Sequence, residues 1–273
     1  MWHIWHKATY GLISTHGVVP LAWSLDHPGP MARSISDLAL MLNEMAGYDP
    51  EDPASLKVPL PDYRADLHKG IKGVKIGIPT YYMMDLDSDI EKLFHKAIDL
   101  LKEMGAEVRE MSLPELKLSS FAGYMITPGE ASSFHYEWLK ESHESYAPDV
   151  RAFFQAGTAM SAPQYVRAQQ SRREMIKAFD EAFETVDILL GPTVPITTPR
   201  FQESWVEQNL EIIRQCMPFT SPPNVTGTPS LALPMGVCSD GLPAGMQMIG
   251  KHLTEDLLLR AGKAWEDTGA WHP

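Results

Sequence analysis

Three consecutive segments of this chain are patterned as a strand, a helix and a second strand, which limits the fold to helices packed on a sheet. Residues 73–79 alternate branched apolar side chains with other residues, as a half-buried strand does. An apolar stripe at helical spacing then occupies residues 88–104, where Ser88 and Glu91 are placed as a capping box. Residues 106–114 form the second predicted strand. A strand–helix–strand unit of this length favours a layered α/β domain.

The rest of the chain adds strands and helices that fit such a sheet. Further strands are predicted at 187–191, 230–236 and 244–250, the last two joined through Asp240-Gly241. A helix is predicted at 35–46, where Ser34 is the cap with Asp37 as its partner, and another within 128–186, where Ser161 is the cap with Gln164 in the box position. Thr254 is predicted to cap the last helix. A further helix is predicted at 203–217, with an apolar stripe formed by Val206, Leu210, Ile213 and Met217. We therefore expect an α/β fold with a mixed β-sheet covered by helices on both faces.

The composition describes an acidic chain with an ample apolar fraction. Of the 273 residues, 44% are hydrophobic, and the formal net charge is −12. Because an acidic surface repels phosphate backbones, we expect no direct nucleic-acid partner. The two cysteines, Cys216 and Cys238, lack metal-binding spacing, and no apolar run is long enough to cross a membrane. We expect a cytoplasmic protein with reduced cysteines, no metal, no cofactor and no membrane partner.

Other polar groups fit a solvated surface better than a site. His135, His143, Glu130 and Glu144 are interpreted as isolated surface residues, because the sequence does not group them as metal ligands. The run at 171–184 mixes both signs of charge, which is typical of the solvated face of a helix.

Three stretches resemble the amidase signature family. Residues 24–47, SLDHPGPMARSISDLALMLNEMAG, are similar to the segment that follows the catalytic core in that family. Residues 7–11, KATYG, resemble its lysine-proline-threonine-tyrosine-glycine stretch, with Ala8 in place of the proline. Residues 224–229, NVTGTP, resemble its asparagine-leucine-threonine-glycine-leucine-proline pattern. The resemblance covers residues 7–268 and corresponds to the C-terminal portion of a family member.

This resemblance implies hydrolysis of amide carbon–nitrogen bonds by a Ser-Ser-Lys mechanism. An activated serine attacks the carbonyl, and backbone N–H groups of a glycine-rich loop stabilise the oxyanion. In the family this machinery lies upstream of the stretch resembled by residues 24–47, so we expect the 273 residues to lack it. The doublets Ser119-Ser120 and Ser132-Ser133 have no flanking glycines, and Lys7 comes too late in the family order. No catalytic residue is therefore assigned.

The substrate-pocket candidates also come from the resemblance. The loop after the strand at 187–191 resembles the family's proline-threonine-proline loop beside the substrate pocket, which points to Thr193 and Pro195. The Asn-x-Thr-Gly sequence, interpreted as a polar turn, adds Asn224, Thr226 and Gly227, because a backbone at glycine can approach a ligand closely.

The resemblance divides the chain into three parts. Residues 7–47 correspond to the post-catalytic loop and helix, 48–72 to an exposed proline-rich linker, and 73–268 to the C-terminal α/β part. Together, residues 1–273 are interpreted as a partial amidase signature domain whose sheet is incomplete at its N-terminal side. Unpaired apolar surface there, including Trp2 and Trp5, predicts self-association or a second polypeptide as partner.

Three interpretations remain open. The chain is part of an amidase that is inactive alone and acts on a small-molecule amide once the missing segment is supplied. Alternatively, it is a non-catalytic binding or interaction protein, or one chain of a split amidase or of a glutamyl-tRNA(Gln) amidotransferase A-type subunit. The amidotransferase needs polar groups to hold glutamine, whereas residues 217–220, MPFT, are mostly apolar, which favours a general amidase.

Overall fold

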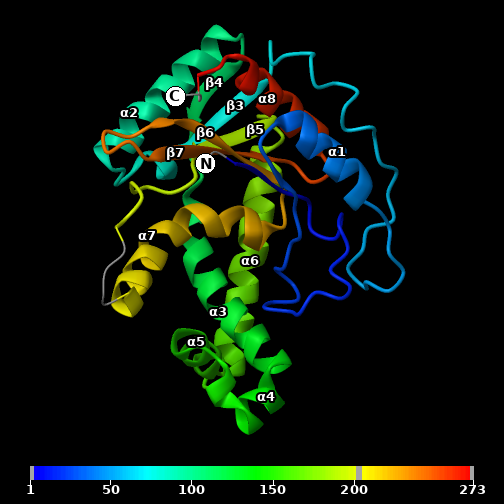
Figure 1. The fold of residues 1–273 in the computed structure, drawn as a ribbon, viewed down its shortest axis with the longest axis vertical. Coiled ribbons are helices and arrows are strands. Elements are labelled where there is room, and N and C mark those ends of the chain that lie inside the picture. Colours follow the sequence, from blue (N-terminus) through cyan, green and yellow to red (C-terminus); the bar gives the residue numbers. More distant parts are fainter. Residues whose placement is uncertain (1–2, 201–204, 271–273) are drawn as a thin grey trace.

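The computed structural model describes residues 3–200 and 205–270 and contains a seven-stranded sheet in the order β2-β1-β6-β7-β5-β3-β4 (Figure 1). The strands are β1 (Ile4–Lys7), β2 (Met31–Ala32), β3 (Lys75–Pro79), β4 (Glu107–Met111), β5 (Ile188–Pro192), β6 (Ser230–Val237) and β7 (Pro243–Gly250). β3 pairs in parallel with β4 and β5, and the other neighbours are antiparallel. The mixed sheet confirms the predicted α/β fold class, and all five predicted strands are present.

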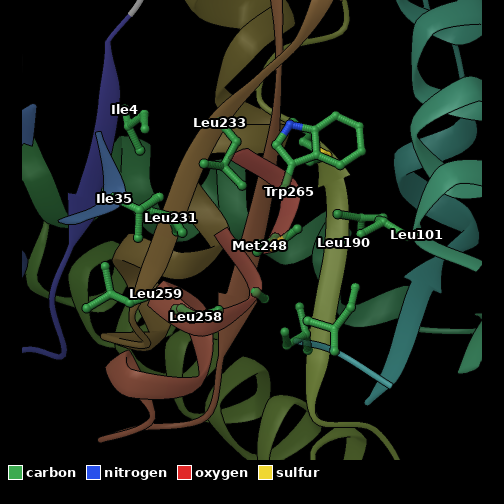
Figure 2. Packing of buried hydrophobic residues seen from close by; sticks show 14 of the residues in the cluster. Ile4, Ile35, Leu101, Leu190, Leu231, Leu233, Met248, Leu258, Leu259 and Trp265 are labelled. Carbon is green, nitrogen blue, oxygen red and sulfur yellow. The ribbon is translucent and has the colours of Figure 1, made fainter. Parts of the chain in front are cut away.

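One face of the sheet is covered by α1 (Ile35–Met45), α2 (Ser88–Glu103) and α8 (Glu255–Asp267). Figure 2 shows Trp265 and Leu258 of α8 lying against Leu233 and Met248 of the sheet. The indole Nε1 of Trp265 donates to the carbonyl of Pro234 at 2.9 Å, so this large buried side chain also satisfies its polar atom. The main hydrophobic core therefore lies between these three helices and the sheet.

The opposite face carries α3 (Leu118–Phe134), α6 (Ala162–Ala182) and α7 (Trp205–Thr226). A second buried cluster joins them to the sheet through Leu189 and Ile249. α3 and α6 extend away from the sheet and carry α4 (Tyr136–Glu141) and α5 (Pro148–Thr158) at their far end (Figure 1). Short 3-10 turns occur at η1 (Thr80–Met83), η2 (Pro114–Lys117) and η3 (His143–Ser145).

Two of the four predicted helix caps, those at Ser34 and Ser161, are confirmed as side-chain caps. Thr254 is the N-cap residue of α8, but its side chain makes no capping hydrogen bond and its hydroxyl donates to the carbonyl of Lys251 at 2.8 Å. Ser34 accepts from the backbone N–H of Asp37 at 3.1 Å, and the Ser161–Gln164 capping box is formed. The predicted Ser88 cap is wrong, because Ser88 is already the first residue of α2. Asp87 is the N-cap and accepts from the N–H of Asp89 at 3.1 Å.

α7 departs from the predicted helix at 203–217, of which residues 203 and 204 lie outside the described residues. The helix continues through Pro218, Pro222 and Pro223 and ends at Thr226. The predicted apolar stripe is wrong as a buried face, since Leu210 is 65% exposed and Ile213 38%. The polar turn expected at 224–226 is instead the last turn of this helix, followed by Gly227 at φ +74° in the position of a C-terminal glycine.

The proline-rich stretch at 48–72 contains no helix or strand, as a linker does, but it is not exposed throughout. Tyr63, Leu67 and Ile71 are buried in the main core, and the carboxylate of Asp52 accepts from Thr15. The expectation of an exposed linker is therefore wrong for these residues, because the apolar side chains that follow the last proline of the stretch, Pro61, pack into the main core.

Candidate functional site

A cavity of about 510 Å³ opens where four segments of the chain meet. They are the end of β1, the loop around residues 25–29, the exit of β5 and the last turns of α7. Its floor is formed by β6 and β7. Polar lining residues from these elements include Lys7, His27, Thr193, Asn224, Ser230 and Gln247. A neighbouring hollow of about 310 Å³ shares Trp5, Thr193 and Ala232 with it, so the two form one depression across the sheet.

Two of the five predicted pocket residues line this cavity. Thr193 and Asn224 are in its wall. Pro195 lies outside it, and its carbonyl accepts from the N–H of Asp87 at 2.8 Å at the start of α2. Thr226 is buried, and its hydroxyl donates to the carbonyl of Pro222 at 2.8 Å. The carbonyl of Gly227 accepts from the N–H of Tyr10 at 3.0 Å, so this glycine holds the KATYG segment and not the cavity.

The loop at residues 24–30, which contains Pro28 and Pro30, brings His27 into the cavity. Its Nδ1 lies 2.6 Å from the carbonyl of Leu25, and its ring meets Tyr10 edge-on with centroids 5.3 Å apart. Burial and the charge of Lys7 lower the pKa of His27 to about 3, against the opposing effects of the Leu25 carbonyl and the Asn224 side chain. The imidazole is therefore neutral at physiological pH.

Lys7 is the cationic group of the cavity. Burial lowers its pKa to about 7, and the negative charge of Glu255 acts in the opposite direction. Glu255 itself is engaged elsewhere, because it accepts from both the N–H and the hydroxyl of Thr9. Near neutral pH, Lys7 is thus divided between its charged and neutral forms.

Gln247 supports the cavity and was not predicted as a site residue. Its side-chain Nε2 donates to the carbonyl of Pro192 at 3.0 Å and to that of Phe219 at 2.8 Å. It therefore joins the exit of β5 to α7 at the cavity floor. Its signal in the sequence is a lone amide between methionines in an otherwise apolar strand, AGMQMIG.

Arg172 of α6 holds the loop that begins at Ser24 and contains His27. Its guanidinium donates to the Ser24 carbonyl at 2.9 Å, to the Ser24 hydroxyl at 3.0 Å and to the Val225 carbonyl at 2.8 Å. Glu130 accepts from the Ser24 N–H at 3.0 Å and from the hydroxyl of Tyr165 at 2.9 Å. The solvated face predicted for 171–184 is therefore wrong at Arg172, which ties α6 to the loop and to the end of α7.

The surface assignment is also wrong for two of the four acids and histidines named. Glu130 is buried in the network just described, and His135 is buried between aromatic rings. His135 stacks on Phe154 with centroids 4.6 Å apart, and its Nδ1 lies 2.9 Å from the hydroxyl of Tyr146. His143 and Glu144 are exposed, as predicted. These contacts join residues from different segments of the chain, such as Ser24 and Glu130. The spacing of apolar and polar residues within one segment carries no information on such contacts.

Both serine doublets, Ser119-Ser120 and Ser132-Ser133, lie in α3. Among residues 3–200 and 205–270, no group of three or more histidine, cysteine or acidic side chains converges as a metal site. Within the same described part of the chain, no helix is long and apolar enough to cross a membrane. The cavity thus offers the Lys7 ammonium, the Asp26 carboxylate, neutral polar groups and apolar walls as its recognition chemistry.

Known proteins are similar to this sequence over almost its whole length. The family described as Amidase matches residues 6–259. An amidase of Pseudomonas putida is 41% identical over 271 residues, which is 97% of this chain and 58% of that protein. The A-type subunit of the glutamyl-tRNA(Gln) amidotransferase of Acaryochloris marina is 39% identical and is matched over 97% of this chain and 60% of its own length. The chain thus spans about three-fifths of these curated relatives.

Solved structures agree with the sequence matches. A chain from a structure described as a vestigial protein complex that reveals the evolutionary origins of an s-triazine catabolic enzyme superposes with a TM-score of 0.88 at 29% identity, over 98% of this chain and 59% of that one. The A-type subunit of the Thermotoga maritima glutamyl-tRNA(Gln) amidotransferase gives a TM-score of 0.84 at 28% identity, over 97% and 58% respectively. Fold, motifs and relatives therefore lead to one conclusion: this chain belongs to the amidase signature family.

Proposed function

We propose that this chain forms the substrate-pocket part of an enzyme that hydrolyses amide carbon–nitrogen bonds. The observation that carries the proposal is the cavity of about 510 Å³ inside a chain that matches the amidase family over residues 6–259. A concave site with a few polar groups on apolar walls suits a small amide. Thr193 and Asn224 are the proposed contacts in its wall, and Pro195, Thr226 and Gly227 are proposed to hold the surrounding loops.

The chemistry of the family requires a serine nucleophile, a base and an oxyanion hole. A free serine hydroxyl is too weakly acidic to attack at neutral pH, so a base must lie within hydrogen-bond reach. Because no residue among the 273 matches the Ser-Ser-Lys set, we propose that this set comes from a segment outside them. The 273-residue chain alone is then expected to bind substrate without turning it over.

The stretch of α7 just before the cavity favours a general amidase over the amidotransferase. Met217 is half-buried, and Phe219 is buried with its ring stacked on Tyr82 at 5.5 Å between centroids. Neither side chain supplies a charge for the amine of glutamine. This stretch therefore suits an amide without that group.

Reconstitution tests the proposal. The part of the Pseudomonas putida amidase that this chain does not match would be co-expressed with residues 1–273, and ammonia release from primary amides would be measured. We expect hydrolysis by the pair and none above background by the 273-residue chain. Asn224→Ala should reduce the activity of the pair, whereas Asn209→Ala on the same helix should not.

Each outcome separates the interpretations. Turnover by the 273-residue chain alone, blocked by a serine-directed inhibitor, would contradict the absence of a nucleophile. A folded pair that binds amides without hydrolysing them would instead support the non-catalytic binding protein. Loss of activity when the supplied nucleophilic serine is changed to alanine is the control that assigns the chemistry.

A further inference from the structure

Lys7 of β1 and Ser230 of β6 lie opposite each other on adjacent strands at the cavity. The antiparallel register of β1 and β6 pairs Lys7 directly with Ser230. Directly opposed residues have Cβ atoms ~4.5–5.5 Å apart and side chains on the same face of the sheet. Both residues line the same cavity, so an ammonium and a hydroxyl are presented side by side to whatever occupies it.

The ammonium of Lys7 has no carboxylate partner. Within the described part of the chain its one hydrogen bond is a long contact of 3.5 Å to the carbonyl of Ala8, and none of the ion pairs includes it. Asp26 lines the same cavity, but its carboxylate accepts from the N–H groups of Leu21 and Ala22. A half-buried cation without a partner is costly, and an anion bound beside it would remove that cost.

We propose that Lys7 and Ser230 form a subsite for a carboxylate, so that the amide bound in this cavity carries an acidic group, as the half-amide of a dicarboxylic acid does. The proposal rests on the proposed function for the amide part of the ligand, whereas carboxylate binding itself needs no hydrolysis. The ammonium forms a charge-assisted hydrogen bond to one carboxylate oxygen, and the Ser230 hydroxyl donates to the same group. Trp5 and Ala232 supply the apolar wall beside them.

The subsite is expected to depend on pH. Lys7, whose pKa is about 7, is surrounded by His6, His27 and His252, whose pKa values are all lowered, and by Asp26 and Glu255, whose pKa values are raised by burial. A bound carboxylate stabilises the charged form of Lys7. Above neutral pH, where free Lys7 is mostly neutral, carboxylate binding must therefore be accompanied by protonation of Lys7. The affinity then falls by about tenfold per pH unit as free Lys7 loses its charge.

Calorimetry on the 273-residue chain tests the subsite with two probes of similar size, succinamate and neutral butyramide. We expect succinamate to bind about tenfold or more tightly than butyramide near neutral pH, a difference that one charge-assisted contact supplies. Lys7→Met should abolish the preference. Lys7→Arg should keep the preference for succinamate at neutral pH. It should also keep this preference in alkaline buffer, where the parent chain loses it. Lys177→Met, an exposed lysine of α6, is the matched control.

Equal binding of the two probes, no binding of either, or an unchanged preference in folded Lys7→Met would overturn the subsite. If Lys7→Met fails to fold, the Lys7→Arg pH profile and a weakened preference in Ser230→Ala decide instead. Reconstituted enzyme that hydrolyses only neutral amides would remove the subsite and leave the proposed function intact. A preference for the carboxylate probe without any hydrolysis on reconstitution would support the subsite and contradict the proposed function.

Discussion

At the scale of single residues, His6 is buried on β1 without the partners that its ring requires. Its exposed fraction is 0%, and neither ring nitrogen has a hydrogen-bond partner among the described residues. Burial, with the charge of Lys7, lowers the pKa of His6 to about 3. A buried polar group without a partner destabilises a fold by about 1–3 kcal/mol.

Replacing His6 by leucine is therefore expected to stabilise the chain. Leucine is of similar size and leaves no orphaned nitrogen, so the free energy of unfolding in urea should rise by about 1–3 kcal/mol at slightly alkaline pH. His16→Leu, at an exposed position, should change it by less than about 0.5 kcal/mol. A loss of stability in His6→Leu would mean that the ring makes interactions absent from this structure.

The same residue gives the chain a dependence on acid. In the unfolded chain His6 binds a proton near its ordinary pKa of 6.5, but in the folded chain only near 3. Stability is unaffected above about 6.5 and falls as pH decreases toward 3, by up to about 1.4 kcal/mol per pH unit for each such histidine. His27 acts in the same direction over the same range. Urea titrations across this range should give a shallower loss for His6→Leu, and parallel curves would refute the assignment.

At the scale of helices and strands, Asp87 and Ser88 are the two adjacent candidates for the N-cap of α2. The Asp87 carboxylate accepts from the N–H of Asp89, whereas Ser88 is already helical. We expect Asp87→Ala to lower the free energy of unfolding by about 0.5–2 kcal/mol. Ser88→Ala should change it by less than about 0.5 kcal/mol. Chemical denaturation of the two variants compares them, and a larger effect at Ser88 would restore the capping box predicted from sequence.

Elements were predictable where local pattern and tertiary packing agree. β3 and β7 alternate or concentrate apolar residues and were located within two residues of their ends. α7 was not, because prolines at 218, 222 and 223 are typical helix breakers, although the helix passes through them. The proline rule describes an isolated helix. Here the side-chain amide of Gln247 donates to the carbonyl of Phe219, which lies four residues before Pro223 and therefore lacks its helical partner.

At the scale of the whole molecule, the cavity could be predicted only in part. Thr193 and Asn224 carried a motif signal, because each belongs to a stretch similar to the family. Lys7 and Ser230 meet through strand register, and Arg172 and Gln247 act through hydrogen bonds to backbone far along the chain. Spacing within one segment carries no information on such pairs. The recognition chemistry of the cavity therefore emerges from topology and not from any single motif.

The sheet ends in an apolar edge on the β2 side, and this bears on how the 273-residue chain behaves in solution. Trp5 of β1 and Met31 of the edge strand β2 are each 57% exposed, whereas Trp2 lies outside the described residues. On α7, Leu210 is 65% exposed. Edge strands and apolar patches of this kind recruit partners. We therefore expect the isolated chain to self-associate or to bind a second polypeptide.

Sedimentation velocity at micromolar concentration checks this expectation directly. The chain should show species heavier than its 30.5 kDa monomer, in proportions that increase with concentration. Met31→Lys places a charge on the edge strand and should shift the distribution toward monomer, as charged residues do on natural sheet edges. Val166→Lys, at an exposed site on α6, should leave the distribution unchanged. A monodisperse monomer with a cooperative melt would show that these residues form a self-sufficient domain, and it would favour a binding protein over one part of a larger amidase.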